Sequence, residues 1–216
     1  MPYYLIVIII SFIGSLICLS NNENRVAPLL FFPVFLCLSV LVEYYGTILA
    51  EKNVNTQALY NFFTVFEFVF YLVFFYFIFP ASGTKRATLV VAVLYFVIAA
   101  LNIFLYQGID SFHTYTYMLG SLIIVTFSIL YFNLLFRRPD SGRLTVNPYF
   151  WIVTGLMFFE TCTFTFYGLN NFIASTMRQY NWVLRFVSDF LNVSLYTLFT
   201  IGFLCKINIR KFLGLS

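Results

Sequence analysis

Five ionisable side chains of this sequence lie inside long apolar stretches: Glu43, Glu67, Glu160, Arg185 and Asp189. Within a membrane-spanning segment such groups are rare, and they mark a ligand site, a proton pathway or a mutual pairing. The sequence therefore predicts that the chemistry of this protein is centred on them.

Polar residues recur at three- and four-residue steps in two of the stretches, which places them on one helical face. Asn61 shares such a face with Glu67, and Asn192 shares one with Arg185 and Asp189. We expect these polar faces to converge.

The four acids are expected at one depth in the membrane. At 1.5 Å per helical residue, Glu43 lies about 10 Å below the outer end of its helix, Asp189 about 12 Å, and Glu67 and Glu160 about 13–15 Å. We predict an outward-facing pocket that binds a proton or a small polar or cationic ligand. Its side chains are Glu43, Glu67, Glu160, Arg185, Asp189, Asn61 and Asn192.

Two structural interpretations compete with this pocket. Arg185 and Asp189, four residues apart, are suited to neutralise each other so that their helix can insert. Protonated Glu43 and Glu160 are suited to hydrogen-bond between helices.

Composition defines the class of protein. Hydrophobic residues make up 62% of the 216 residues and charged residues only 9%, against about 25% charged residues in soluble domains. This excludes a soluble enzyme, a disordered segment and a nucleic-acid binder, and it indicates an integral protein of a lipid bilayer.

Polar breaks divide the chain into seven apolar stretches of membrane-spanning length. We predict an all-α, polytopic membrane protein whose residues 1–216 form a single domain. The seven predicted transmembrane helices cover about 4–20, 27–50, 59–79, 87–106, 115–136, 148–169 and 181–205. The span at 87–106 carries almost no polar residue except Asn102, so we expect it to face lipid or to serve as a spacer.

Basic residues predict the orientation of these helices, because cytoplasmic loops are rich in Lys and Arg. Nine of them follow the first, third, fifth and seventh helices, and only Lys52 and Arg178 lie in the other loops. The N-terminus is therefore expected outside and the C-terminus in the cytoplasm. The nine are Arg25, Lys85, Arg86, Arg137, Arg138, Arg143, Lys206, Arg210 and Lys211.

A weak internal repeat accompanies this topology. Glu43, Tyr60-Asn61 and Glu67 are followed in the second half by Glu160, Tyr180-Asn181 and Asp189. The same order in the same membrane direction predicts a 3+1+3 plan of parallel repeats, as some transporters have.

Catalytic and metal-binding motifs are absent from the sequence. The one histidine, His113, cannot build a three-histidine zinc site, and the four cysteines have no metal-ligand spacing. The sequence predicts no enzyme, no catalytic residue, no metal and no cofactor.

Three motifs resemble those of a family of small bacterial seven-helix inner-membrane proteins. They are Tyr60-Asn61-x-x-Thr64-x-x-Glu67-Phe68, Phe150-Trp151-Ile152-x-Thr154-Gly155 and Asn192-x-x-x-Tyr196, and the segment 112–136 is similar to that family's fifth helix. Family members often have a histidine near the start of the third and seventh helices, where this chain has Asn61 and Arg185 or its neighbours. Because such proteins are often found near sensor kinases and regulators, the resemblance implies the bacterial inner (cytoplasmic) membrane and a signalling partner.

Two functions fit these features. The first is a sensing or signal-coupling component, in which the pocket binds a ligand and the helices pass a shift to a cytoplasmic or membrane partner. The second is a small solute or proton-coupled transporter. The inner halves of the helices, such as 73–79 and 198–204, are largely apolar, which favours sensing.

Overall fold

The computed structural model describes residues 3–20, 27–137, 144–176 and 181–205, and within these ranges the chain is helical without any strand. The helices in chain order are α1 (Tyr4–Ser20), α2 (Ala27–Leu30), α3 (Phe32–Glu51), α4 (Gln57–Ile78), α5 (Ser82–Leu101), the π-helix η2 (Asn102–Tyr106), α6 (Thr114–Phe136), the short 3₁₀-helix η3 (Leu144–Val146), α7 (Pro148–Thr176) and α8 (Asn181–Leu204).

Six segments in the described part of the chain are long and apolar enough to cross a membrane. They are Pro28–Glu51, Gln57–Ile78, Ser82–Tyr106, Thr114–Phe136, Pro148–Gly168 and Arg185–Leu204. The remaining long helix, α1, is apolar but has 17 residues, at the lower limit for a span. The all-α prediction is confirmed, whereas the count of seven spans depends on α1 and stays a prediction.

Some helices begin or end at other residues than predicted, because helical hydrogen bonding does not start and stop where the apolar stretch does. The predicted 27–50 helix is interrupted at Phe31, because Pro33 has no N–H to donate one turn back. The predicted 87–106 helix begins at Ser82, since Lys85 and Arg86 continue the helix beyond the apolar stretch. The predicted 148–169 helix runs on to Thr176.

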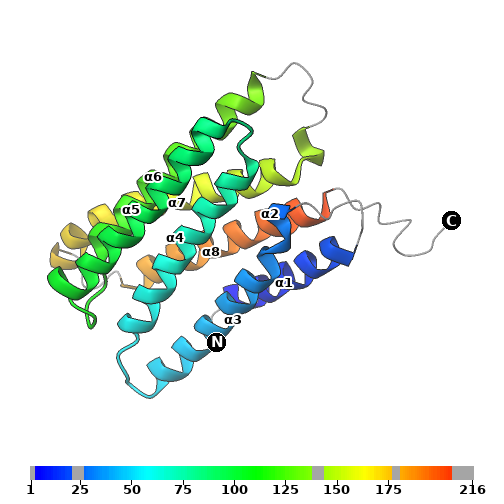
Figure 1. Cartoon of the computed structure of the whole chain (residues 1–216). Coiled ribbons are helices and arrows are strands. Elements are labelled where there is room, and N and C mark those ends of the chain that lie inside the picture. The colour runs from blue at the N-terminus through cyan, green and yellow to red at the C-terminus, as the bar shows by residue number, and fades with distance from the viewer. Residues whose placement is uncertain (1–2, 21–26, 138–143, 177–180, 206–216) are drawn as a thin grey trace.

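The long helices lie side by side and alternate in direction (Figure 1). Around the bundle, α3 packs on α1, α1 on α8, α8 on α7, α7 on α6 and α5 on α4, while α4 also contacts α3 and α6. The bundle therefore has two ends. We call them the Asn53 end, where α3 ends and α4 begins, and the Pro80 end, where α4 ends and α5 begins.

The described basic residues of the predicted cytoplasmic loops gather at the Pro80 end. Lys85 and Arg86 lie in the first turns of α5, and Arg137 caps the end of its antiparallel neighbour α6. Figure 1 shows the start of α5 and the end of α6 at the same end of the bundle. The other predicted loop cations lie outside the described residues: Arg25, Arg138, Arg143, Arg178, Lys206, Arg210 and Lys211. So does Tyr180, on which the predicted repeat depends.

The outer surface of α5 carries large apolar side chains that no other part of the described chain covers. Leu89, Val90, Val93, Leu94 and Phe96 are all more than half exposed. Such a continuous apolar face is suited to lipid, in agreement with the expectation that this span faces the bilayer.

Near the Pro80 end the interior is aromatic. Phe32 is fully buried, and its ring centroid lies 5.4 Å from that of Phe74, 5.5 Å from that of Phe199 and 5.3 Å from that of Phe203. These edge-to-face contacts, favoured by the quadrupoles of the rings, join α3, α4 and α8. We call Phe32, Phe74, Phe199 and Phe203 the aromatic plug.

Candidate functional site

Glu43, two turns before the end of α3, accepts hydrogen bonds from two tyrosines on other helices. Tyr4 Oη of α1 donates to Glu43 Oε2 at 2.6 Å, and Tyr60 Oη of α4 donates to the same oxygen at 3.4 Å. Gly46, one turn further along α3, leaves room for the Tyr60 hydroxyl. One carboxyl therefore joins three helices near the Asn53 end.

Glu67 lies in the middle of α4 and is held by its own helix. Tyr71 Oη, one turn further on, donates to Glu67 Oε1 at 2.6 Å, and the Tyr71 side chain is fully buried. The charge of Glu67 interacts with those of Glu43 and Glu160. Glu67 is thus the middle member of a row.

Glu160 is the most deeply buried carboxyl of the row, with 1% of its surface exposed. Ser121 Oγ of α6 donates to Glu160 Oε2 at 2.6 Å, which joins α6 to α7. The Thr163 hydroxyl, one turn along α7, donates to the backbone carbonyls of Phe159 at 2.9 Å and Glu160 at 3.3 Å. We call Glu43, Glu67 and Glu160 the carboxyl row.

Tyrosines surround the carboxyl row on every side. Those whose electrostatic interactions reach one or more of its members are Tyr4, Tyr60, Tyr71, Tyr95, Tyr117, Tyr167 and Tyr196. Within the described part of the chain, the electrostatic partners of the row are acids and hydroxyl groups, with no lysine, arginine or histidine. The row therefore lacks a basic counter-charge there.

Arg185 and Asp189 lie beside the row rather than in it. Both line a cavity of about 730 Å³ between α8 and Tyr3 at the start of α1, and Asp189 interacts electrostatically with Glu43 and Tyr4. Both side chains are described, and no ion pair within 4 Å joins them, so the pairing interpretation gains no direct contact. Asp189 thus links the cavity to the start of the row.

Asn192 lies one turn beyond Ser188 on α8 and donates from Nδ2 to the Ser188 carbonyl at 2.9 Å. The structure therefore places it on the predicted face of α8, with its amide hydrogen-bonded to its own helix.

Asn61 is fully buried, but its amide is engaged with the loop before α6. Its Nδ2 donates to the Ile109 carbonyl at 3.2 Å and to the Ser111 carbonyl at 2.7 Å, and its Oδ1 accepts from the His113 backbone N–H at 3.2 Å. In this position Asn61 holds the loop. Its ligand role stays a prediction.

His113, the residue before α6, is completely buried, and its Nε2 has no hydrogen-bond partner. Burial lowers the pKa of His113 from 6.5 to about 4, because a charged imidazole loses its hydration there. Its Nδ1 lies 3.3 Å from Asn61 Oδ1. The ring is therefore a neutral part of the loop's packing.

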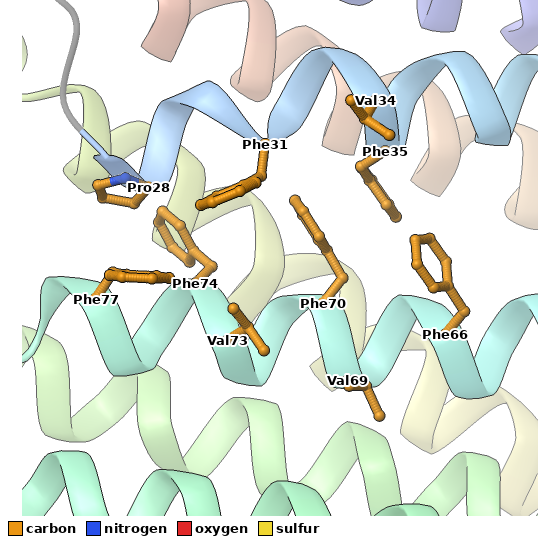
Figure 2. A pocket seen from close by; sticks show the side chains of 10 residues that line it. All are labelled: Pro28, Phe31, Val34, Phe35, Phe66, Val69, Phe70, Val73, Phe74 and Phe77. Carbon is orange, nitrogen blue, oxygen red and sulfur yellow. The ribbon is translucent and has the colours of Figure 1, made fainter.

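A second cavity, of about 290 Å³, opens between α2–α3 and α4 (Figure 2). Figure 2 shows Phe31 and Phe35 facing Phe66, Phe70 and Phe74 across it. Its lining is wholly apolar, so it lacks the polar groups that orient a polar ligand. This groove is suited to hydrocarbon chains of lipid and is not the candidate site.

Sequence reasoning missed several hydroxyl groups of the site, among them those of Tyr4 and Tyr95. Tyr4 was interpreted only as the beginning of an apolar helix, and Tyr95 belongs to the span expected to carry almost nothing polar. A tyrosine counts as apolar in a periodicity pattern, although its hydroxyl is a hydrogen-bond donor. Such partners could be found in the sequence as tyrosines predicted at the same membrane depth as an acid in another helix.

These features define the class of protein: a multi-pass helical membrane protein with a row of carboxyl groups inside its bundle. Comparison of the chain with protein-family models, with curated proteins and with solved structures gives no match.

Proposed function

We propose that this protein is a sensing or signal-coupling component that binds a small cation in an outward-facing acidic pocket within the membrane. The pocket comprises the carboxyl row and Asp189, with Arg185 and Asn192 at its mouth and Asn61 holding the adjoining loop. In this proposal the N-terminus is outside, α1 completes seven spans, and the membrane is the bacterial inner membrane.

The observation that carries the proposal is a row of three carboxyls that lack a basic partner among the described residues. Negative charge in an apolar interior is costly unless it is neutralised. A bound cation, with the proton as the smallest case, removes that cost. Binding of a cation therefore changes the buried charge of the site, and this change distinguishes the occupied state from the empty state.

Access supports the outward direction of the pocket. The cavity lined by Arg185 and Asp189 lies beside Tyr3, whose neighbour Tyr4 donates to Glu43. A cation entering there meets Asp189 first, then Glu43, and then the deeper acids.

The aromatic plug supports sensing over transport. A carrier needs polar groups on both sides of its site so that access can alternate. Beyond the carboxyl row towards the Pro80 end, Phe32 closes the interior by its contacts with Phe74, Phe199 and Phe203. In this proposal a movement of the helices transmits the signal, and the ligand does not cross the membrane.

Charge at the Pro80 end supports a cytoplasmic partner. Lys85, Arg86 and Arg137 gather there, and basic surface groups steer acidic partners. The resemblance to seven-helix proteins found near sensor kinases points to the same kind of partner.

A proton-coupled transporter is the alternative function. It is favoured by one observation, that the row reaches from α3 through α4 to α7. Successive carboxyls across a bundle are typical of proton relays.

The test uses the purified full chain, in nanodiscs for binding and in liposomes for flux. Thermal unfolding is followed while protons, sodium ions, potassium ions and spermidine are titrated one at a time. We expect one of these cations to stabilise the protein, Glu67→Gln and Asp189→Asn to abolish that effect, and Glu51→Gln, at the exposed end of α3, to retain it. Stabilisation by none of the cations would contradict the binding site.

Flux measurements in the liposomes separate the two functions. Sensing predicts no movement of the stabilising cation across the membrane. Flux that Glu67→Gln abolishes and Glu51→Gln preserves would establish the transporter instead.

A further inference from the structure

The deepest part of the carboxyl row contains a hydroxyl without a partner. Tyr95 of α5 is 1% exposed, and its Oη makes no hydrogen bond in the structure. This hydroxyl nevertheless lies near enough to Glu160 and Glu67 to interact with both electrostatically. Buried hydroxyls are nearly always hydrogen-bonded, so an unpartnered one beside two carboxyls calls for a physical reason.

The surroundings of Glu160 favour its protonated form. Its side chain is 1% exposed, and its carboxyl accepts a hydrogen bond from Ser121 Oγ. The neighbouring Thr163 hydroxyl is directed to backbone carbonyls, that of Phe159 at 2.9 Å and that of Glu160 at 3.3 Å. A buried carboxylate without a basic partner is costly, and protonation removes its charge.

Ser121 fits the same arrangement. Its hydroxyl donates to Glu160 Oε2 at 2.6 Å, which leaves Oε1 for the proton. A protonated Glu160 is neutral and attracts a hydroxyl donor less strongly than a carboxylate does. The Tyr95 hydroxyl is left without a partner.

We propose that Glu160 is a proton-binding site and that Tyr95 is the group that responds to its occupancy. With the proton bound, Glu160 is neutral and accepts from Ser121, and the Tyr95 hydroxyl is free. On release, the O–H bond of Glu160 breaks, its electron pair stays on the carboxylate, and the proton passes towards Glu67. The ionised carboxylate then takes a new hydrogen bond from the Tyr95 hydroxyl.

The groups that face Glu160 are suited to a proton rather than to a larger cation. They are Tyr95 from α5, Tyr117 and Ser121 from α6, Glu67 and Tyr71 from α4, and Thr163 and Tyr167 from α7 itself. Within the described residues this set contains no basic side chain, and no group of three or more His, Cys, Asp or Glu suited to a metal ion is present there. The Tyr95 oxygen is also enclosed too tightly to touch a water-sized occupant.

This inference rests on the proposed function and names its ligand. It also identifies the moving element, because the new hydrogen bond joins α7 to α5, the helix whose first turns carry Lys85 and Arg86 at the Pro80 end. Proton release at Glu160 is thereby coupled to the basic surface proposed for the partner.

The test is a pH titration of the full chain in nanodiscs, followed by the infrared band of protonated carboxyl groups. We expect Glu160→Gln to remove one titrating band and to keep the thermal stability of the parent, since an amide copies the donor of a protonated carboxyl. Tyr95→Phe deletes only the responding hydroxyl. It should move the titration midpoint to higher pH by about one to two units, as loss of a hydrogen bond to a charged group predicts.

Tyr76→Phe is the matched control, because this tyrosine lies near the Pro80 end beneath Lys85, away from the row. It should leave the midpoint unchanged. A midpoint unaffected by Tyr95→Phe, or a band that survives in Glu160→Gln, overturns the inference.

Exchange of sodium for potassium at constant pH separates this inference from the proposed function. No change of the band is expected. A band that depends on sodium would show a metal cation in the pocket, which overturns the proton assignment and leaves the cation-binding function standing.

Discussion

Gly120 of α6 allows the close approach of α6 to α4 beside the carboxyl row. A Cβ atom at this position would lie 2.8 Å from Cδ2 and 2.9 Å from Cδ1 of the Phe68 ring. Phe68 is 1% exposed and is wedged between Tyr95 and Tyr117, with each ring centroid 5.4 Å away. The ring therefore has no free space into which to move.

Gly120→Ala should accordingly destabilise the protein. Overpacking a close-packed interior costs about 1–3 kcal/mol, and the better helix propensity of alanine returns about 0.5–1 kcal/mol. The net loss is about 1 kcal/mol, within limits of roughly 0 and 2.5 kcal/mol, which for a chain of this size lowers the unfolding temperature by a few degrees.

Thermal unfolding of variants in identical nanodiscs measures this difference. Gly83→Ala is the matched control, because a Cβ at Gly83 meets nothing within 4 Å, and it should be neutral or slightly stabilising. If Gly120→Ala unfolds at the same temperature as Gly83→Ala, then α6 and α4 are not packed as described and the reasoning fails.

Three further predictions concern the site and the loop beside it. Gly46→Ala puts a Cβ against the hydroxyl end of the Tyr60 side chain; it should displace Tyr60 from Glu43 and weaken cation stabilisation while the unfolding temperature without cation stays near that of the parent. Asn61→Ala leaves buried groups of the loop unpaired, at about 1–3 kcal/mol each, and should raise amide hydrogen exchange over 109–113; exchange equal to that of the parent would contradict this role. His113 is neutral in the fold with a pKa of about 4, against 6.5 when unfolded, so the unfolded state gains the proton first. Stability should be complete above pH 6.5, fall by up to about 3 kcal/mol as the pH drops to 4 and then level off, and His113→Gln should remove that part of the pH dependence.

The fold was predictable to the extent that it depends on apolar length. Long apolar runs bounded by Asn, Gly, Pro and charged residues predicted each long helix close to its observed position, because a spanning backbone must satisfy its hydrogen bonds within a helix. The interruption at Phe31 and the continuation of α7 to Thr176 were missed. Both depend on individual backbone hydrogen bonds rather than on apolarity.

The candidate site was predictable in its acids and not in their partners. An ionisable group within an apolar run stands out on its own, so Glu43, Glu67 and Glu160 could be selected from the chain. Their bonds to Tyr4, to Tyr71 and to Ser121 involve hydroxyls that occur throughout the sequence. Only the rotation of each helix decides which of these hydroxyls faces an acid.

The sequence by itself determined that this chain is a helical membrane protein and which of its few charges lie within the apolar segments, because both follow from composition and length. Tertiary structure alone decided that α1, α3 and α4 meet at Glu43, that Asn61 holds a loop, and that Tyr95 lies unpartnered beside Glu160. The physical reason is that a helix presents residues on all sides, and packing between helices selects the side that faces the interior.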